Sequence, residues 1–209
     1  MQYDQLLGQY EELLKIADSA FDQIKSQHQE CVKCEVKCAD CCHAIFGLFI
    51  IEAIHLRHYY EQFSDAEKEE ILKRASEADK QLADLNEKME ALAENPEAQV
   101  LLMSKERIRC PLLNDDQQCM LYENRPHTCR VYGIPTIAGG QVHTCEKSDF
   151  KEDVNYPVYN MAGAHKKMYK MSTELMEQAG FKDSEKASLL ISVSKAVQTS
   201  LEDLINEDF

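Results

Sequence analysis

The sequence predicts a mostly α-helical protein, a helical bundle with a long helical hairpin and an embedded cysteine-rich segment of loops and hairpins. Apolar residues recur at steps of three and four along most of the 209 residues, which is the spacing of one helix face. Turn-forming residues gather in one segment, 107–144, and strands do not alternate with helices as in a parallel α/β protein. We expect a single domain over 1–209, with a cysteine-cluster region at 31–145 that a helical insertion interrupts at about 64–95.

The first helix is expected over residues 2–27 and the second over 44–63. In the first, six residues share one apolar face: Leu6, Tyr10, Leu13, Ala17, Phe21 and Ile24. The second segment is apolar at its start and amphipathic afterwards, as in a buried helix that leaves the cysteine block.

A third, longer helix should begin after Ser64, because Ser64 and Glu67 have the spacing of a capping box. Seven residues then form a heptad-like apolar stripe on a charged rod: Ile71, Ala75, Ala78, Leu82, Leu85, Met89 and Leu92. This stripe should pack lengthwise against another helix, most simply the first one. Pro96 ends the rod, and one or two further turns are expected over 98–105.

The turn-rich segment 107–144 should form a compact arrangement of loops and hairpins. Its turn signals are Asn114, Asp115, Asp116, Pro126, Gly133, Pro135, Gly139 and Gly140. The helical pattern resumes over 156–178, with Gly180 as its stop. A last helical segment is expected after Ser184, with five residues on one face: Leu190, Val193, Val197, Leu201 and Leu204.

The charge and hydropathy of the chain exclude several functional classes. A formal net charge of −14 argues against a protein that grips the nucleic-acid backbone, since such proteins cluster Lys and Arg. No window has the apolar length of a membrane span, and the start of the chain lacks the basic flank and apolar run of a leader. We therefore expect a cytoplasmic location without a nucleic-acid or membrane partner. In that reducing compartment, nine clustered cysteines indicate a metal or redox site rather than disulfides.

The cysteines form two groups along the chain. The first has five members, Cys31, Cys34, Cys38, Cys41 and Cys42, whose spacing brings sulfur together both in a helix and in a pair of turns. The second, Cys110, Cys119, Cys129 and Cys145, lies in the turn-rich segment. There Arg125 and Arg130 either lower thiol pKa values or pair with surface acids.

We expect one thiolate-rich site that joins both groups, with all nine cysteines as candidate metal ligands. Nine sulfurs can fill two four-ligand sites or one larger cluster with spare thiols, and zinc and an iron–sulfur cluster both fit. We favour the cluster, because surplus cysteines suit a centre that is assembled or exchanged. His43 and His143 could complete a Cys3His zinc site, but with so much sulfur we expect them to be solvated or hydrogen-bonded. His127 is expected to donate a hydrogen bond to a ligand.

The order of these residues resembles a known family. Cys34-x3-Cys38-x2-Cys41-Cys42 is followed by Cys110-Pro-Leu-Leu, by Cys119-x2-Tyr122-x2-Arg125-Pro126-x2-Cys129-Arg130, and by Cys145. This order is similar to that of the CxxCxxCC family of zinc- or iron-chelating proteins, also called YkgJ-like cysteine cluster proteins. The resemblance implies eight ligand-type cysteines and a bound zinc or iron centre. The three-residue gap after Cys34 and the additional Cys31 depart from the family pattern, so either of these two could be the first ligand.

The sequence therefore predicts a metal-binding protein, without indicating its biological task. One alternative is an iron–sulfur-containing, methyltransferase-like enzyme related to the flagellin lysine N-methylases, which are larger relatives in the family. No glycine-rich cofactor loop after a strand supports it. The other alternative is a metal-braced helical interaction module that docks a protein partner on an exposed stripe at 71–92. We identify no catalytic residue and leave enzymatic activity open.

Overall fold

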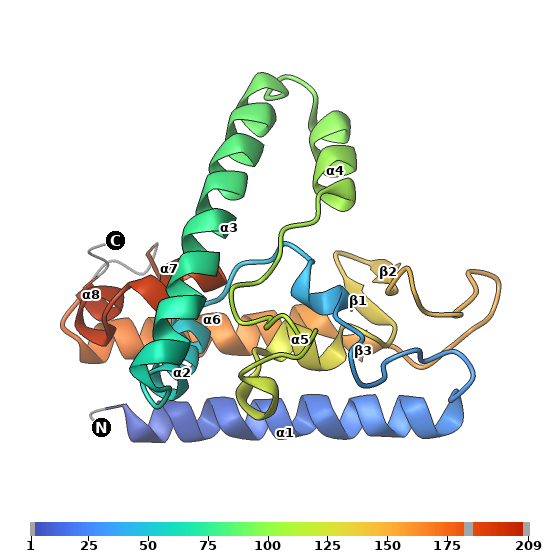
Figure 1. The fold of residues 1–209 in the computed structure, drawn as a ribbon. Helices are drawn as coiled ribbons and strands as arrows, with labels where there is room; N and C mark the ends of the chain where they lie inside the picture. The colour runs from blue at the N-terminus through green and yellow to red at the C-terminus, as the bar shows by residue number, and fades with distance from the viewer. Residues whose placement is uncertain (1–2, 182–185, 207–209) are drawn as a thin grey trace.

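The computed structural model describes residues 3–181 and 186–206, and it confirms the mostly helical prediction (Figure 1). The described α-helices are α1 (Asp4–Gln27), α2 (Ile50–Tyr60), α3 (Asp65–Ala91), α4 (Pro96–Lys105), α5 (His127–Val131), α6 (Met161–Gln178), α7 (Val193–Gln198) and α8 (Leu201–Asn206). Short 3-10 helices are η1 (Asp40–Cys42), η2 (Tyr122–Asn124) and η3 (Lys186–Ser188), and the strands are β1 (Thr136–Ala138), β2 (Gln141–His143) and β3 (Tyr159–Asn160). Among these described helices, none combines the length and the apolar character needed to cross a membrane.

The main core forms where α2 packs between α1, α6, α7 and α8 (Figure 1). Helix α2 is apolar on nearly all sides, so burial in the centre of the bundle removes most of its surface from water. Its buried apolar residues include Ile50, Ile51 and Ile54. From α1 the core receives Tyr10 and from α6 it receives Met168, both fully buried.

The helix expected over 44–63 begins only at Ile50, so the prediction is wrong for residues 44–49. Here the chain is extended, because its backbone pairs with the segment before α7. The N–H of Leu48 donates to the carbonyl of Ile191 at 2.7 Å, and the N–H of Ile191 donates back at 2.8 Å. Glycine at position 47 permits this approach, since a Cβ there would lie 2.4 Å from the Cβ of Leu190.

Helix α3 begins as the sequence predicts. The backbone N–H of Ser64 donates to Oε2 of Glu67 at 2.9 Å, and the N–H of Glu67 donates to Oγ of Ser64 at 3.4 Å. Both halves of the capping box are therefore present, and they satisfy N–H groups that the first helical turn leaves unpaired. The expected turns after Pro96 are confirmed as α4.

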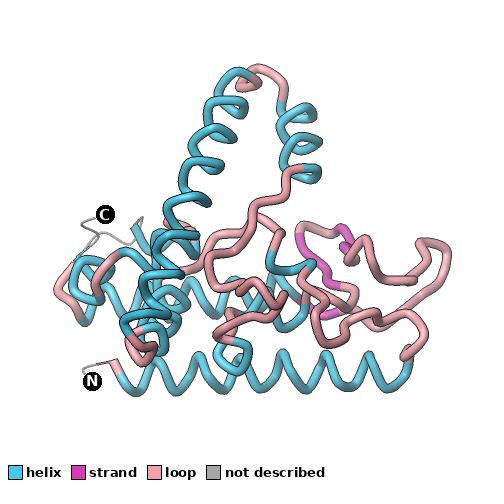
Figure 2. The backbone as a smooth tube through the Cα atoms, in the orientation of Figure 1, coloured by secondary structure: helices cyan, strands magenta, loops and turns pink. Residues whose placement is uncertain are grey.

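The predicted lengthwise packing of α3 on α1 is wrong. Helix α3 starts against α7 and rises away from α1, and α4 returns toward its base, so the long hairpin consists of α3 and α4 (Figures 1 and 2). The apolar stripe is nevertheless buried within the chain. Ile71 and Ala75 lie in the main core, while Ala78 and Leu85 pack with Ile108 and with side chains of α4. A stripe buried in this way gives no support to a protein partner docked on it.

The turn-rich segment contains the expected hairpin. Strands β1 and β2 pair antiparallel, and Gly139 and Gly140 join them with φ values of 58° and 79°, a backbone region that favours glycine. Strand β3 pairs with the other edge of β1 in parallel, with Thr136 opposite Tyr159, and leads into α6. The rest of the chain between α4 and α5 is almost entirely loop (Figure 2).

The last helical segment is divided. Ser184, its predicted start, lies outside the described residues. The remainder forms η3, α7 and α8, because Ser192 and Ser200 each begin a new helix by accepting a backbone N–H at 3.0 Å. Val197 and Leu204 are buried as the shared face requires, whereas Leu190 is 57% exposed and does not belong to that face.

Substitution of one buried residue tests the packing of the α3–α4 hairpin. Leu85→Ala should lower the free energy of unfolding by about 2–5 kcal/mol, because it removes a buried side chain from the contacts with Ile108 and α4. Leu72→Ala makes the same chemical change on the same helix at a position that is 39% exposed. It should change the free energy of unfolding by only about 0.5 kcal/mol. Urea unfolding of both variants measures the difference; equal losses would contradict the packing described.

Candidate metal centre

Two backbone hydrogen bonds bring the two cysteine segments together. The N–H of Cys110 donates to the carbonyl of Cys42 at 2.7 Å, and the N–H of Ile108 donates to the carbonyl of His43 at 3.1 Å. Helices α2, α3 and α4 all lie between these segments in the sequence. The end of the first cysteine group, at Cys42, is thus fixed beside Cys110 of the second group by main-chain hydrogen bonds.

A tight loop over residues 113–119 brings Cys119 close to Cys42 and Cys110. The N–H of Gln118 donates to Oδ1 of Asn114 at 2.8 Å, and the N–H of Asn114 donates to the carbonyl of Gln118 at 3.0 Å. Asparagine suits this turn because its side chain can replace a backbone acceptor. Leu113 then pairs with Cys119 across the loop. The predicted turn therefore positions one of the candidate ligands.

Cys129 lies on α5, which buried polar contacts attach to α1 and α2. The N–H of His127 donates to Oε1 of Glu52 and to the hydroxyl of Tyr10, both at 3.2 Å, and that hydroxyl donates to Glu52 at 3.0 Å. Burial raises the pKa of Glu52 to about 7, although hydrogen bonds from the N–H of Phe49, from Tyr10 and from His127 favour its ionised form. These contacts fix the first turn of α5 against the core.

Arg130 attaches the other side of α5. It is buried, pairs with Asp18 of α1, and donates from Nε to the carbonyl of Arg125 at 3.0 Å. Arg125 also pairs with Asp18, at 3.6 Å, and its guanidinium lies 4.2 Å from the centre of the Tyr122 ring. The ion pairs of Asp18 with Arg125 and Arg130 hold the loop before α5 against α1.

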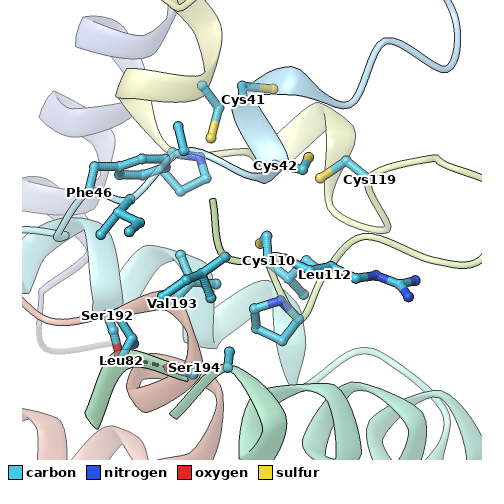
Figure 3. A pocket seen from close by; sticks show the side chains of 18 residues that line it. Cys41, Cys42, Phe46, Leu82, Cys110, Leu112, Cys119, Ser192, Val193 and Ser194 are labelled. Atoms are coloured by element: carbon cyan, nitrogen blue, oxygen red, sulfur yellow. Dashed lines mark hydrogen bonds between the residues drawn. The ribbon is translucent and has the colours of Figure 1, made fainter. Parts of the chain in front are cut away.

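Five cysteines surround one cavity of about 70 Å³ (Figure 3). We call them the cavity group: Cys41, Cys42, Cys110, Cys119 and Cys129. The remaining wall is mostly apolar and comes from the segment before α2, from α3 and from α7, with Phe46, Leu82 and Val193 among its members. In Figure 3 the sulfur atoms of Cys42 and Cys119 face each other. Thiols from separate parts of the chain therefore meet at one place that is largely lined by apolar groups.

The thiols of the cavity group affect one another's protonation. Cys42 hydrogen-bonds to Cys119 and to Cys41, which raises the pKa of Cys42 and lowers the pKa of each neighbour. Burial raises the pKa of Cys110 to about 12 and raises the pKa of Cys129 well above its usual value. Because the thiolate is the metal-binding form, a metal held by these side chains would have to displace their protons.

Arg125 contributes positive charge to the cavity group. Its guanidinium lowers the pKa of Cys41 and of Cys119, after the larger effect of the hydrogen bond from Cys42. Both roles that the sequence suggested for the arginines, ion pairing and thiolate stabilisation, thus apply to Arg125. Arg130 is engaged with Asp18 and with backbone carbonyls.

A second set of donors lies around Cys145, whose thiol contacts Asp40 on η1. We call it the Asp40 group: Asp40, Cys34, Cys38 and Cys145. The thiol of Cys145 donates to Oδ2 of Asp40 at 3.2 Å, and both residues are buried. The carboxylate also receives Nη2 of Arg107 at 2.6 Å and lies 3.6 Å from Nζ of Lys147. Burial, followed by the nearby thiols of Cys38 and Cys145, raises the pKa of Cys34 to about 11.

Cys31 lies apart from both groups. Its sulfur is 3.7 Å from a carboxylate oxygen of Glu30 and 3.9 Å from the hydroxyl of Tyr156. It borders an open hollow together with Lys33 and Phe150. Of the two candidates for the first ligand, Cys34 is the one near other thiols.

Three histidines that the sequence singled out do not hydrogen-bond to the cysteine thiols in the described part of the chain. His43 bonds through Nδ1 to the carbonyl of Ala39 at 3.0 Å, and His143 lies on the exposed strand β2. The predicted bond from His127 to a ligand is wrong, since its Nε2 pairs with the hydroxyl of Tyr159 at 2.8 Å. Its Nδ1 is buried and has no hydrogen-bond partner among the described residues.

The thiols are neighbours, but they are not arranged around one ion. Within the described residues, no group of three or more His, Cys, Asp or Glu side chains is set so that it could hold a metal ion. Binding therefore requires side-chain rotation toward a shared point. The sequence reasoning missed Asp40 and Glu52. Asp40 had a signal, because it is an acid inside the cysteine block, and so had Glu52, an acid within an apolar helix.

Comparison with known families gives a match to the CxxCxxCC family, described as "Putative zinc- or iron-chelating domain", over residues 30–151. This range is more than half of the 209 residues, and it includes all nine cysteines. No curated protein and no solved structure matches the chain.

The pH dependence of stability tests the buried carboxyl of Glu52. Its folded pKa of about 7 lies above the usual value of 4.5, so the unfolded chain releases the proton first as the pH rises. Between pH 5 and pH 7.5 this group should lower the free energy of unfolding by about 2 kcal/mol. His55 and His127, whose pKa values burial lowers to about 4, act in the opposite direction.

The comparison with Glu52→Gln isolates the carboxyl from the histidines, because a neutral amide does not titrate. Urea unfolding at both pH values gives the difference in unfolding free energy between the wild type and Glu52→Gln. This difference should change by about 2 kcal/mol between pH 5 and pH 7.5. A difference that is constant with pH would show that Glu52 does not titrate as its burial requires.

Proposed function

Because the chain belongs to the CxxCxxCC family of zinc- or iron-chelating domains, we propose that its cavity group supplies the thiolates that hold the metal. The observation that carries this proposal is the meeting of sulfur from three parts of the chain. Cys41 and Cys42 come from η1, Cys110 and Cys119 from the loop after α4, and Cys129 from α5. Thiolates are ligands that zinc and iron–sulfur clusters both prefer.

The cavity supports an iron–sulfur cluster over zinc. Zinc needs no space beyond its ligands, because four donors close directly around it at about 2.3 Å. A cluster places several irons and inorganic sulfides between the cysteine sulfurs, and so requires a hollow bordered by thiols. The cavity group borders a hollow of about 70 Å³. Zinc in the same group is the alternative.

A cluster takes about four cysteines, which leaves one of the five in the cavity group free. We take one of the adjacent Cys41 and Cys42 on η1 as this spare thiol, which suits a centre that is assembled in place or exchanged. Bound there, a cluster supplies one-electron chemistry and zinc supplies a structural brace. The apolar wall of the cavity limits the access of water to the thiols. The positive charge of Arg125 offsets part of the negative charge of the thiolates.

Neither alternative function gains support from an observation. A methyltransferase-like activity would need a cofactor pocket, and the cavity beside the thiols has about 70 Å³ and mostly apolar walls. An interaction module would need an exposed apolar stripe on α3, and that stripe is largely buried by α7, Ile108 and α4. We infer a cytoplasmic setting on the argument made from the sequence, in which no window has the apolar length of a membrane span.

Metal analysis of anaerobically purified protein tests the proposal. We expect stoichiometric iron with acid-labile sulfide and a brown colour. Cys129→Ser should lose both, because α5 then presents no sulfur to the cavity. Cys31→Ser is the matched control and should keep both, since Cys31 lies outside the cavity group.

The possible results distinguish an iron–sulfur cluster from zinc, and both from failure of the proposal. A colourless protein with stoichiometric zinc that Cys129→Ser removes would replace the cluster by zinc in the same group. A folded wild type without metal, or a Cys129→Ser variant with unchanged metal content, would refute the assignment to the cavity group.

A further inference from the structure

A second hollow lies beside the end of α1 and shares no wall with the first cavity. It has a volume of about 850 Å³, and its described wall contains no member of the cavity group. The wall comes from residues 30–33, which follow α1, and from residues 148–156, in the long loop between β2 and β3 (Figure 1). Sites for small molecules have volumes of roughly 300–1,000 Å³, so the hollow is large enough for one.

Hydrogen bonds and an ion pair join the two segments that form this hollow. The N–H of Asp149 donates to the carbonyl of Cys31 at 2.9 Å, and Oδ2 of Asp149 pairs with Nζ of Lys33 at 2.6 Å. Within the loop, Oγ of Ser148 donates to the carbonyl of Cys145 at 2.6 Å. The wall of the hollow is therefore positioned by contacts within the fold, and a ligand would not have to create it.

Three aromatic rings stand nearly perpendicular to one another at this wall. Phe150 and Tyr156 both line the hollow, with ring centroids 4.9 Å apart and an angle of 84° between the ring planes. The ring of His28, which follows the last turn of α1, lies 5.1 Å from Tyr156 at 90° and 6.4 Å from Phe150 at 69°. Phe150 and Tyr156 thus form an aromatic corner, and His28 packs against both rings and supports it.

Glu30 adds a negative charge beside the aromatic corner. It lines the hollow, and the thiol of Cys31 donates to its carboxylate at 3.7 Å. The same sulfur lies 3.9 Å from the hydroxyl of Tyr156, so the carboxylate and the aromatic corner are close to each other. In the part of the chain that the structure describes, Glu30 forms no ion pair, and the ammonium of Lys33 is bound to Asp149. The charge of Glu30 is therefore available to a ligand.

The charges around the hollow favour a cation over an anion. An anion would meet the exposed ammonium of Lys151, whose charge water screens, and would be repelled by Glu30. A cation would meet the carboxylate of Glu30 and the negative faces of two rings. The net charge of −14 for the whole chain also attracts cations.

From these contacts we propose that the hollow binds a small organic cation that carries an alkylated ammonium group, held by Phe150, Tyr156 and Glu30. Ring faces attract cations, and quaternary ammonium groups in particular bind where aromatic rings enclose them. Such a group has no N–H to satisfy, and its methyl groups can pack directly on the rings. This site goes beyond the proposed metal binding, because it uses none of the cavity group.

Titration of the full chain with choline tests the site. Nuclear magnetic resonance follows the ring protons of Phe150 and Tyr156, which a bound ammonium group should shift in a saturable way. The comparison ligand is the neutral alcohol in which carbon replaces the nitrogen of choline, because it has the same shape without the charge. We expect it to bind at least about threefold more weakly than choline, the loss that corresponds to a partly exposed cation–π contact.

Matched variants separate the roles of the rings and of the carboxylate. Tyr156→Leu should weaken choline binding about threefold or more, because it removes one ring of the aromatic corner, whereas Tyr156→Phe keeps the ring and should bind like the wild type. Glu30→Gln should also weaken binding, because it removes the charge and keeps the shape. Far-ultraviolet circular dichroism checks folding. Glu30 is exposed, so Glu30→Gln serves if Tyr156→Leu fails to fold.

Three results would overturn the proposal. They are no saturable shift up to about 10 mM choline, equal affinity for the neutral alcohol, and unchanged choline affinity in both Tyr156→Leu and Glu30→Gln. Flotation with phosphatidylcholine vesicles identifies the source of the ammonium group. Choline binding without flotation assigns the site to a dissolved ligand, and flotation that Tyr156→Leu abolishes assigns it to a lipid headgroup.

Discussion

The structure depends on the main-chain pairing of Cys42 and His43 with Ile108 and Cys110. Side-chain sulfur alone cannot bring distant segments together before a metal is present, because thiols are weak hydrogen-bond partners. Two amide hydrogen bonds in a buried setting make that contact part of the fold. The thiols are consequently neighbours as a result of folding, and a metal has only to rotate side chains rather than to order a disordered loop.

Buried polar contacts extend this arrangement to Cys129. Glu52 and Tyr10 meet the backbone of α5 on one side, and Asp18 pairs with Arg130 on the other. Removing one partner from such a network leaves a buried charge or donor unpaired, which is costly. The α3–α4 hairpin supplies apolar side chains to the wall of the cavity, including Leu82. The helical part of the chain thus acts as a scaffold for the loops that carry the cavity group.

Much of the fold and the donor set follows from local sequence signals. The capping box at Ser64, the turn at Gly139 and Gly140 and the helical spacing are local, and the structure confirms them. The partner of α3 is a tertiary choice, since an apolar stripe fits any apolar surface. The extended segment at Leu48 likewise depends on Ile191, far along the chain. The division of the cysteines by Asp40 could not be predicted from spacing, because it depends on which way a single 3-10 turn points its side chains.

The position of the bound metal tests directly whether separate segments of the chain supply its ligands. Anomalous diffraction from crystals of anaerobically purified protein, recorded at the iron and zinc absorption edges, locates each bound metal. The account predicts a peak inside the cavity, in contact with sulfur from both the Cys42 segment and the Cys110 segment. A metal bound by cysteines of one segment only, with the cavity thiols unligated, would contradict it.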